Sequence, residues 1–229
     1  MKVIILAAGR GTRMKDLTSN KPKPLIEVNG KPFLYYLIEN VHKAGFNNLG
    51  IIVNYKKEQI REFLDKYNIR AKLIQQIDES GVGAAIKSAK EFVGNENFIS
   101  LMGDNYYFSE DLMKMNNNDE YCYMHSTYSH NPEKYGVIVS NNGFVSQVVE
   151  KPKEFITNTV STGLYKLTPE IFNALDQIDI SERGECEIPD AFNLLAKQGK
   201  VKVIKSKKPW LDFGCPEDIP KVNEFLDKL

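Results

Sequence analysis

The sequence predicts an α/β protein with a mixed, mostly parallel sheet, helices on both faces of that sheet, and a β-rich second half. In the first half, short apolar runs of strand length alternate with longer stretches whose apolar residues have helical spacing. The second half changes to closely spaced β-rich runs. The chain has 229 residues and no linker-like segment, so we expect one domain over residues 1–229 with halves at 1–115 and 116–229.

The elements of the first half follow from local patterns. Gly45 is a common type of helix stop signal, and Ile60, Phe63 and Leu64 recur at the spacing of one helix face. We expect strands at residues 2–6, 49–53, 71–75 and 97–101 and helices at residues 33–44, 57–67 and 83–92.

Three loops of this half are expected to meet at one edge of the sheet. Right-handed strand–helix–strand crossovers make such a sheet parallel. Ligands of open parallel sheets bind beyond the carboxyl ends of the strands. The loops after Leu6, Gln76 and Leu101 should therefore converge on one crevice.

The second half contains several short strands and three helical stretches. Asn141-Asn142-Gly143 separates two β-rich runs and is typical of a hairpin turn. We expect strands at residues 121–126, 136–140, 144–150, 160–167 and 201–204 and helices at residues 169–175, 188–197 and 217–229.

The composition limits the classes of function. Lys plus Arg and Asp plus Glu both number 30, which argues against a surface for nucleic acid or anionic membranes. Cys122, Cys186 and Cys215 form no CxxC pair, so we expect reduced thiols. The apolar run at residues 3–8 is too short for a signal peptide, and no stretch approaches the roughly 20 apolar residues of a membrane span. We therefore expect a soluble, cytoplasmic protein.

The opening loop has the composition of a phosphate site. Gly9 and Gly11 allow close approach of the backbone, and the cations Arg13, Lys21 and Lys23 follow within a short distance. Neither the Gly-Lys-Ser/Thr of a P-loop nor a third glycine at the Rossmann spacing is present. The loop therefore indicates phosphate chemistry of another kind.

The residues 6–14 and 21–25 resemble the N-terminal motif of sugar-1-phosphate nucleotidyltransferases, most of all the glucose-1-phosphate thymidylyl- and uridylyltransferases. The resemblance implies a Rossmann-like nucleotide-diphospho-sugar transferase fold with a nucleotide-binding first half and a sugar-phosphate-binding second half. It also implies that Arg13 contacts the triphosphate and that Lys23 binds and activates the reacting groups. The loop residues expected to wrap the triphosphate are Leu6, Ala7, Ala8, Gly9, Gly11 and Thr12.

Two further matches concern the base and a metal. In the family, a glutamine before a glycine-rich helix start contacts the nucleobase, which points to Gln76 and Gly81. Without the resemblance, a strand end followed by a helix start is an equally good interpretation of these residues. Asp104, in Gly103-Asp104-Asn105, follows an expected strand and matches the family's metal ligand. Mg²⁺ prefers one or two carboxylates together with substrate phosphates.

The remaining matches surround the expected sugar phosphate. Their candidate sugar-phosphate residues are Gly136, Glu150, Lys151, Gly163 and Trp210, and Asp212 is the expected second Mg²⁺ ligand. Trp210 reads equally well as a core residue. Arg183 matches a family arginine, but a solvated loop is nearly as good an interpretation. Cys215 stands where the family usually has threonine, which puts the local hydrogen bonding in doubt.

The expected reaction transfers a nucleotidyl group from UTP or dTTP to glucose-1-phosphate with release of pyrophosphate. The nucleophile is a phosphate that is already ionised, so no catalytic histidine is needed, and His42, His125 and His130 are expected at the surface. The sequence stops near residue 229, so a C-terminal β-helix with acyltransferase activity is expected to be absent.

Several alternatives stay open from the sequence. The protein could be a guanylyl- or cytidylyltransferase acting on another sugar or alcohol phosphate, or a regulatory nucleotide-sugar sensor without catalysis. A glycosyltransferase is disfavoured because the Asp-x-Asp metal motif is missing after the strand that precedes Asp104. The sequence leaves open which base and sugar are used and whether the chain forms a homo-oligomer.

Overall fold

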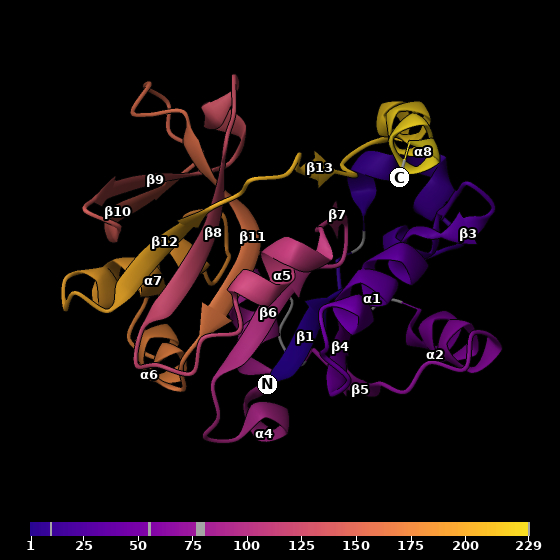
Figure 1. The fold of residues 1–229 in the computed structure, drawn as a ribbon, viewed down its shortest axis with the longest axis horizontal. Coiled ribbons are helices and arrows are strands. Elements are labelled where there is room, and N and C mark those ends of the chain that lie inside the picture. The colour runs from indigo at the N-terminus through magenta and orange to yellow at the C-terminus, as the bar shows by residue number, and fades with distance from the viewer. Residues whose placement is uncertain (10, 55, 77–80, 229) are drawn as a thin grey trace.

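The computed structural model describes residues 1–9, 11–54, 56–76 and 81–228. Within these residues the fold is built around a nine-stranded mixed sheet (Figure 1). The strand order is β5-β4-β1-β6-β11-β8-β12-β10-β9. The bounds of these strands along the chain are β1 Lys2–Leu6, β4 Leu49–Val53, β5 Lys72–Gln75, β6 Phe98–Met102, β8 Cys122–Tyr128, β9 Gly136–Asn141, β10 Phe144–Glu150, β11 Thr159–Leu167 and β12 Val201–Lys205.

The first half of the sheet is parallel, as the strand–helix alternation predicts. Strand β1 lies between β4 and β6, and Ile5 pairs in parallel register with Ile51 on one side and Leu101 on the other. Strand β5 extends this parallel part beyond β4. The carboxyl ends of these strands therefore open on the same edge of the sheet.

The second half of the sheet is mixed. Strand β11 runs antiparallel to both β6 and β8, whereas β12 runs parallel to β8. Strands β9 and β10 form the expected hairpin, in which Asn142 and Gly143 have φ of 48° and 81°. Left-handed residues at this turn match the right-handed twist of the two strands.

Helices cover both faces of the sheet because the side chains of β1 alternate between two cores. Ile4 and Leu6 face the core that α3, α4, α6 and α7 complete, while Val3 and Ile5 face the core of α1, α2 and α5. The helix bounds are α1 Phe33–Lys43, α2 Lys57–Lys66, α3 Val82–Lys87, α4 Lys90–Val93, α5 Ser109–Lys114, α6 Glu170–Leu175 and α7 Ile188–Ala196.

A third, smaller core joins the two ends of the chain. From β12 the chain crosses to the N-terminal half through β13 (Leu211–Asp212), and the yellow α8 (Ile219–Asp227) then lies beside indigo segments of residues near the N-terminus (Figure 1). Met14, Phe213 and Val222 are each fully buried in this core. The Phe213 ring stacks on Phe33 with centroids 4.9 Å apart, which fixes the position of β13.

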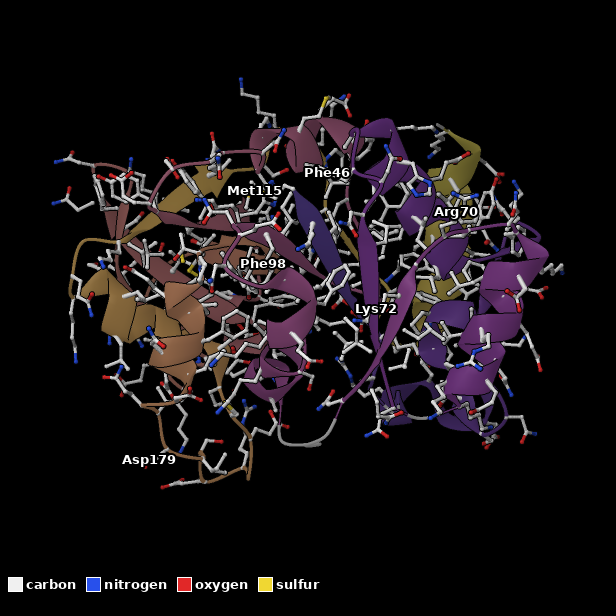
Figure 2. All side chains as sticks on the ribbon, turned by 90° about the horizontal axis from the view of Figure 1, so that it is seen from below. Phe46, Arg70, Lys72, Phe98, Met115 and Asp179 are labelled. Carbon is white, nitrogen blue, oxygen red and sulfur yellow. The ribbon has the colours of Figure 1, made fainter. Side chains whose placement is uncertain are left out.

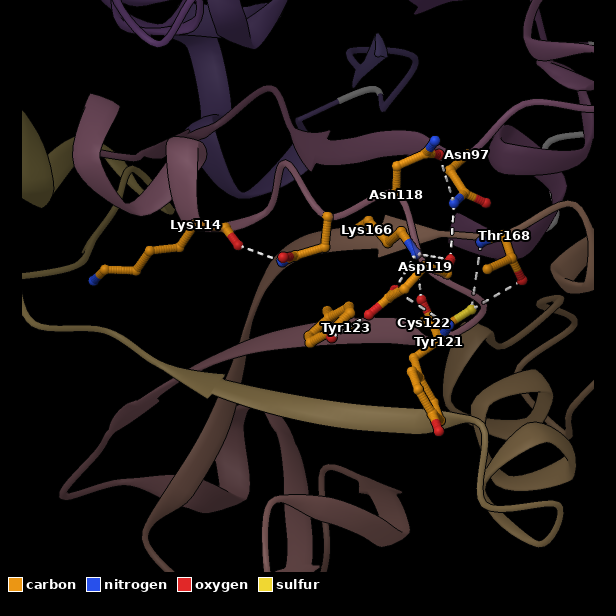
Figure 3. A network of polar contacts seen from close by, with 10 residues as sticks. Asn97, Lys114, Asn118, Asp119, Tyr121, Cys122, Tyr123, Lys166 and Thr168 are labelled. Carbon is orange, nitrogen blue, oxygen red and sulfur yellow. Dashed lines mark hydrogen bonds and ion pairs between the residues drawn. The ribbon is translucent and has the colours of Figure 1, made fainter.

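A buried ammonium group holds the loop before β8 (Figure 3). The Lys166 side chain has 0% exposure, and its Nζ donates to Asp119 O at 2.7 Å, Asp119 Oδ1 at 2.9 Å and Tyr121 O at 2.6 Å. The second carboxylate oxygen of Asp119 accepts from the Tyr123 hydroxyl at 2.7 Å. All three donors of the lysine are therefore used within the protein.

The structure differs from the predicted elements in three ways. The helix expected at residues 83–92 is split into α3 and α4, because the Ala89 N–H donates to Ile86 O in a tight turn and the Ser88 hydroxyl donates to Ala84 O. The C-terminal helix is preceded by a 3₁₀ turn, η4 (Pro216–Asp218), and the final residue of its expected span, Leu229, lies outside the described residues. Elements that the sequence did not indicate are α5, β13, η1 (Thr12–Thr18), η2 (Lys23–Leu25), η3 (Pro132–Lys134), β2 (Glu27–Val28), β3 (Lys31–Pro32) and β7 (Asn105–Tyr106).

Candidate active site

Two adjoining cavities open beyond the carboxyl ends of the parallel strands. The larger, of about 510 Å³, brings together the loops after β1, β5 and β6, as the topology predicts. The smaller, of about 260 Å³, lies over the β-rich half. The residues that line both cavities are Arg13, Val82, Met102, Asp104 and Glu185.

The opening loop forms one wall of the larger cavity. Gly11 has φ of 64° and precedes η1, and an added Cβ would meet Lys23 Cβ and Thr18 Cγ2 at 3.0 Å each. Glycine is therefore required here for both backbone conformation and space. Further residues of this cavity that the sequence proposed are Leu6, Ala7, Ala8, Gly9, Gln76 and Gly81.

Lys23 lies buried beside this loop and reaches a carboxylate on another element. It begins η2 with 6% exposure, and its Nζ donates to Asp104 Oδ2 at 2.6 Å. In the described part of the chain, Asp104 is the hydrogen-bond partner of this ammonium group. Because Lys23 also lines the larger cavity, its remaining donors are available to a ligand there.

Asp104 is placed by a close approach between two strands. The Gly103 N–H donates to Leu6 O at 2.9 Å, and a Cβ on Gly103 would lie only 2.8 Å from that oxygen. Glycine thus lets the chain after β6 pass tightly against the end of β1. The next residue, Asp104, then lies beside the opening loop.

Asp212 joins Asp104 through a two-stranded pairing. Strand β13 pairs with β7 so that Asp212 lies opposite Asn105, and the Phe213 N–H donates to Asp104 O at 2.9 Å. Asp104 lines both cavities, whereas Asp212 lines the smaller one. The structure therefore brings the two predicted metal ligands together at the junction of the cavities.

This junction holds an excess of carboxylates. Burial and then the neighbouring charge of Asp104 raise the pKa of Asp212 to about 6, against the opposing effect of Lys23 and Arg13. A divalent cation would remove this repulsion, and a pair of carboxylates completed by substrate phosphates suits Mg²⁺. Among the described residues, no group of three or more His, Cys, Asp or Glu side chains is placed so that it could hold a metal ion by itself.

A third carboxylate, Asp218, was not singled out from the sequence. Its Oδ2 accepts from the Gly214 N–H at 2.9 Å, the Cys215 N–H at 2.8 Å and the Cys215 thiol at 3.2 Å. The doubt raised by Cys215 is thereby resolved, because the thiol makes the local hydrogen bond that a threonine hydroxyl could make. Asp218 holds the loop that follows Asp212, and its negative charge also contributes to the raised pKa of Asp212.

Two segments of the β-rich half, one with Glu150 and Lys151 and one with Arg183, supply charged side chains to the smaller cavity. Lys151 has φ of 44°, an uncommon conformation for a residue other than glycine, and its N–H donates to Tyr135 O at 3.0 Å. Arg183 Nη2 lies 2.6 Å from Glu187 and 3.9 Å from Glu150. Burial raises the pKa of Glu150, although Lys151 and Arg183 act in the opposite direction. Arg183 thus belongs to the cavity wall rather than to a loop away from the site.

Backbone and aromatic surfaces complete the smaller cavity. Gly136 and Gly163 both line it, and a Cβ on Gly136 would meet Glu150 Oε2 at 3.1 Å. Trp210 is half-buried, packs against the core of α1, α2 and α5, and meets the Tyr135 ring edge to face at 5.1 Å. It therefore serves both as a core residue and as a cavity wall.

Thr12 was predicted to bind the nucleotide, and the three histidines were predicted at the surface. Thr12 begins η1, and its side chain lies outside the described part of the structure, so its predicted contact with the triphosphate stays a prediction. His125 was expected at the surface but has 2% exposure, so that prediction is wrong. His42 and His130 are exposed as expected.

A third hollow, of about 700 Å³ and thus larger than both cavities of the site, lies away from them around β5 and α2. Figure 2 shows Arg70 and Lys72 at this side of the molecule, whereas Phe98 lies in its interior and Asp179 on a peripheral loop. The hollow is lined by exposed cations and apolar residues but lacks the glycine loops and paired carboxylates of the two cavities. No described helix has the length and apolar character needed to cross a membrane.

The fold and this arrangement of loops define a nucleotidyltransferase type of protein. The chain belongs to the nucleotidyl transferase family, whose model matches residues 2–228.

Individual relatives extend this comparison. The bifunctional protein GlmU of Methanocaldococcus jannaschii is 38% identical over 232 residues, which cover 100% of this chain and 55% of the relative. The UTP–glucose-1-phosphate uridylyltransferase AglF of Haloferax volcanii is 33% identical over 237 residues, covering 100% of this chain and 97% of the relative. The chain therefore spans about half the length of the former and almost all of the latter.

Solved structures agree in fold. A Bacillus anthracis protein assigned as a glucose-1-phosphate thymidylyltransferase, in complex with sucrose, has a TM-score of 0.89 at 25% identity, covering 100% of this chain and 96% of that one. A UDP-glucose pyrophosphorylase complexed with UDP-glucose has a TM-score of 0.88 at 24% identity, covering 99% and 98%. The latter likeness shows the fold alone.

Proposed function

We propose that the protein transfers a nucleotidyl group from a nucleoside triphosphate, UTP or dTTP, to a sugar-1-phosphate, glucose-1-phosphate in the first place. The observation that carries this proposal is the junction of two cavities, where Lys23, Arg13 and the Asp104–Asp212 carboxylate pair come together. Two anionic substrates that must meet need such a shared, charged wall.

The larger cavity suits the triphosphate. Gly9 and Gly11 line its wall, a Cβ added at Gly9 would meet no atom within 4 Å, and Arg13 and Lys23 supply positive charge along that wall. Gln76 and Gly81 lie on the same cavity, where an amide side chain can hydrogen-bond a pyrimidine edge. We assign them to the nucleobase.

The smaller cavity suits a sugar phosphate. Lys151 and Arg183 offer cationic groups for its phosphate, while Glu150 offers acceptors for sugar hydroxyls. Gly136 and Gly163 allow a sugar ring to lie close to the backbone. We assign Trp210 to the wall that limits the size of this ring.

The reaction follows from this placement. A phosphate oxygen of the sugar-1-phosphate attacks the α-phosphorus, a new P–O bond forms, and the bond to the β-phosphate breaks with release of pyrophosphate. Lys23 neutralises charge on the approaching phosphates, and Arg13 neutralises charge on the departing pyrophosphate. Catalysis therefore depends on positioning and electrostatics. Asp104 and Asp212 would hold Mg²⁺, which polarises phosphate oxygens when bound.

The proposal concerns base and sugar as well as reaction class. The named activity of AglF, which this chain matches over nearly its full length, supports UTP and glucose-1-phosphate. The larger family also contains bifunctional members, so guanylyl or cytidylyl transfer to another sugar phosphate is the alternative that the test must separate.

A matrix assay tests the proposal. Purified protein with Mg²⁺ is mixed with each of UTP, dTTP, GTP, CTP and ATP against glucose-, mannose- and N-acetylglucosamine-1-phosphate, and pyrophosphate release is measured. We expect the fastest release with UTP or dTTP and glucose-1-phosphate. Reactions without sugar phosphate are the control for hydrolysis. Fastest release with GTP, CTP or ATP refutes the base assignment, and no pyrophosphate in any well refutes the reaction.

A further inference from the structure

A bulge in β11 forms part of the smaller cavity. The register between β11 and β8 shifts between Ser161 and Tyr165, and Thr162 and Gly163 of the bulge line the cavity. Gly163 has φ of 77°, and a Cβ there would lie 2.4 Å from Met102 Cγ. The ladder of hydrogen bonds is interrupted at such a bulge, so its conformation needs support from elsewhere.

The support comes from buried side chains behind the bulge. Thr162 Oγ1 lies 2.9 Å from His125 Nδ1 and donates to His125 O at 3.3 Å. A hydroxyl has a single hydrogen, so Oγ1 accepts from the Nδ1–H while it donates to the carbonyl. The Tyr107 hydroxyl donates to Thr162 O at 2.7 Å. Both the side chain and the main chain of Thr162 are thereby held.

On its other side, His125 faces a buried carboxylate on α5. Its Nε2 lies 3.7 Å from Asp111 Oδ1, an ion-pair distance rather than a hydrogen bond. Asp111 is buried and accepts from Lys114 Nζ at 2.5 Å and from Ser206 Oγ at 2.8 Å. The imidazole therefore sits between an anchored carboxylate and the bulge, and His125 lines neither cavity.

We propose that His125 is a positioning residue for the sugar phosphate: it holds Thr162, and with it the Thr162–Gly163 backbone against which a hexose 1-phosphate lies. The inference rests on the proposed function and adds to it a residue that acts from behind the cavity. Lys23 and Asp104 belong to other elements, η2 and the loop after β6, so loss of the His125 contact changes sugar binding and leaves nucleotide binding and turnover in place.

Two substitutions separate this role from simple packing. In His125→Asn the amide nitrogen takes the place of Nδ1 and keeps a donor toward Thr162. In His125→Gln the amide extends to the position of Nε2, toward Asp111, and the donor to Thr162 is lost. Tyr123→Phe is the matched control, because it removes a hydrogen bond two residues away on the same strand, to Asp119 and not to Thr162.

The experiment measures steady-state pyrophosphate release with each substrate varied in turn, together with thermal unfolding of each variant. We expect His125→Gln to raise KM for glucose-1-phosphate about tenfold, the effect of one lost hydrogen bond, with kcat and the KM for the triphosphate within about twofold. His125→Asn and Tyr123→Phe should both keep the sugar-phosphate KM within about twofold of the wild type.

Other outcomes overturn the inference. An equal sugar-phosphate KM in His125→Asn and His125→Gln, or an equal rise in both substrates' KM values, would show that His125 only fills space. A rise in Tyr123→Phe as large as that in His125→Gln would show a general loss of stability. If the wild-type protein releases pyrophosphate but the variants match it, the inference alone fails. If the wild type releases none, the proposed function fails and the inference with it.

Discussion

Two buried lysines of this protein, Lys166 and Lys23, each pair with an aspartate but differ in how many acceptors surround them. Lys166 donates to three oxygens of Asp119 and Tyr121, and so uses every hydrogen of its ammonium group (Figure 3). Lys23 donates to Asp104 and lines a cavity with its other hydrogens. Both side chains are almost fully buried, so burial alone does not distinguish them.

The comparison separates a charge that is satisfied within the fold from one that keeps donors for a ligand. A buried ammonium group with all donors satisfied stabilises the fold and has nothing left to offer a ligand. A buried ammonium group that keeps unused donors at a cavity can bind the anionic oxygens of a ligand, because the protein itself offers no further acceptors. Loss of Lys166 should therefore reduce stability, whereas loss of Lys23 should reduce activity.

The largest effect should follow from changing the partner of Lys23. We expect Asp104→Asn to lower kcat by about a thousandfold, since the substitution removes a charge that would hold Mg²⁺. The amide oxygen still accepts from Lys23, so the fold should be retained. Asp119→Asn, which changes a carboxylate outside both cavities, is the matched control and should keep its turnover. Near-normal turnover in folded Asp104→Asn would refute the metal assignment.

Lys23→Met should come next. We expect kcat to fall by about a hundredfold, because one preorganised positive group is lost from the reacting phosphates. The free energy of unfolding, measured in urea, should change by less than about 1 kcal/mol, because Asp104 lines both open cavities and water there can solvate its carboxylate once the ammonium group is gone. If stability falls as strongly as activity, Lys23 is a structural residue like Lys166.

Lys166→Met should show the opposite pattern. The loss of its three hydrogen bonds, to two carbonyls and one carboxylate, should lower the free energy of unfolding by about 3 kcal/mol. Turnover at a temperature where the variant is folded should stay within about twofold of the wild type. A specific loss of kcat with unchanged urea stability would contradict the comparison.

The smallest effect concerns the pH dependence of the Lys166 cluster. Burial raises the pKa of Asp119, but hydrogen bonds from Tyr123 and Lys166 outweigh this effect and hold the pKa below the usual value of an aspartate. A carboxyl whose pKa is lowered by folding stabilises the protein above its unfolded pKa, and this stabilisation is lost as the pH falls through the folded value.

Asp119→Asn should therefore lower stability by less than about 1 kcal/mol at pH 7, because the carboxylate is one-third exposed. The difference from the wild type should be constant down to about pH 4 and shrink below it. Urea unfolding of both proteins from pH 7 to pH 3 measures this. A difference that grows toward acid pH would mean that folding raises the pKa.

The sequence predicted those parts of the site that are encoded by contiguous residues better than those that depend on distant segments. The glycines of the opening loop and the strand ends beside them are contiguous patterns, and the structure places Gly9, Gly11 and Arg13 on one cavity. The placement of Asp212 beside Asp104 depends on β7 and β13, which have two residues each. Strands this short leave no periodicity, so only the resemblance indicated that the two carboxylates belong together.

His125 shows why the remaining parts were not predictable. Its strand, β8, was predicted, but its burial depends on α5 from one direction and on the β11 bulge from another. Helix α5 has only six residues and was not recognised, and a bulge carries no composition signal of its own. The same holds for Asp218, whose role follows from the turn that it caps.

The return of the chain from β12 to α8 has a consequence for how the protein is made. Met14 of the first segment is buried against Phe213 and Val222, and the Asn29 N–H donates to the Asn223 side chain at 3.0 Å. During synthesis the opening loop leaves the ribosome long before these partners exist. The nascent chain thus carries the opening loop without Asp212, and the candidate site becomes complete only when β13 and α8 pack against the segment that was made first.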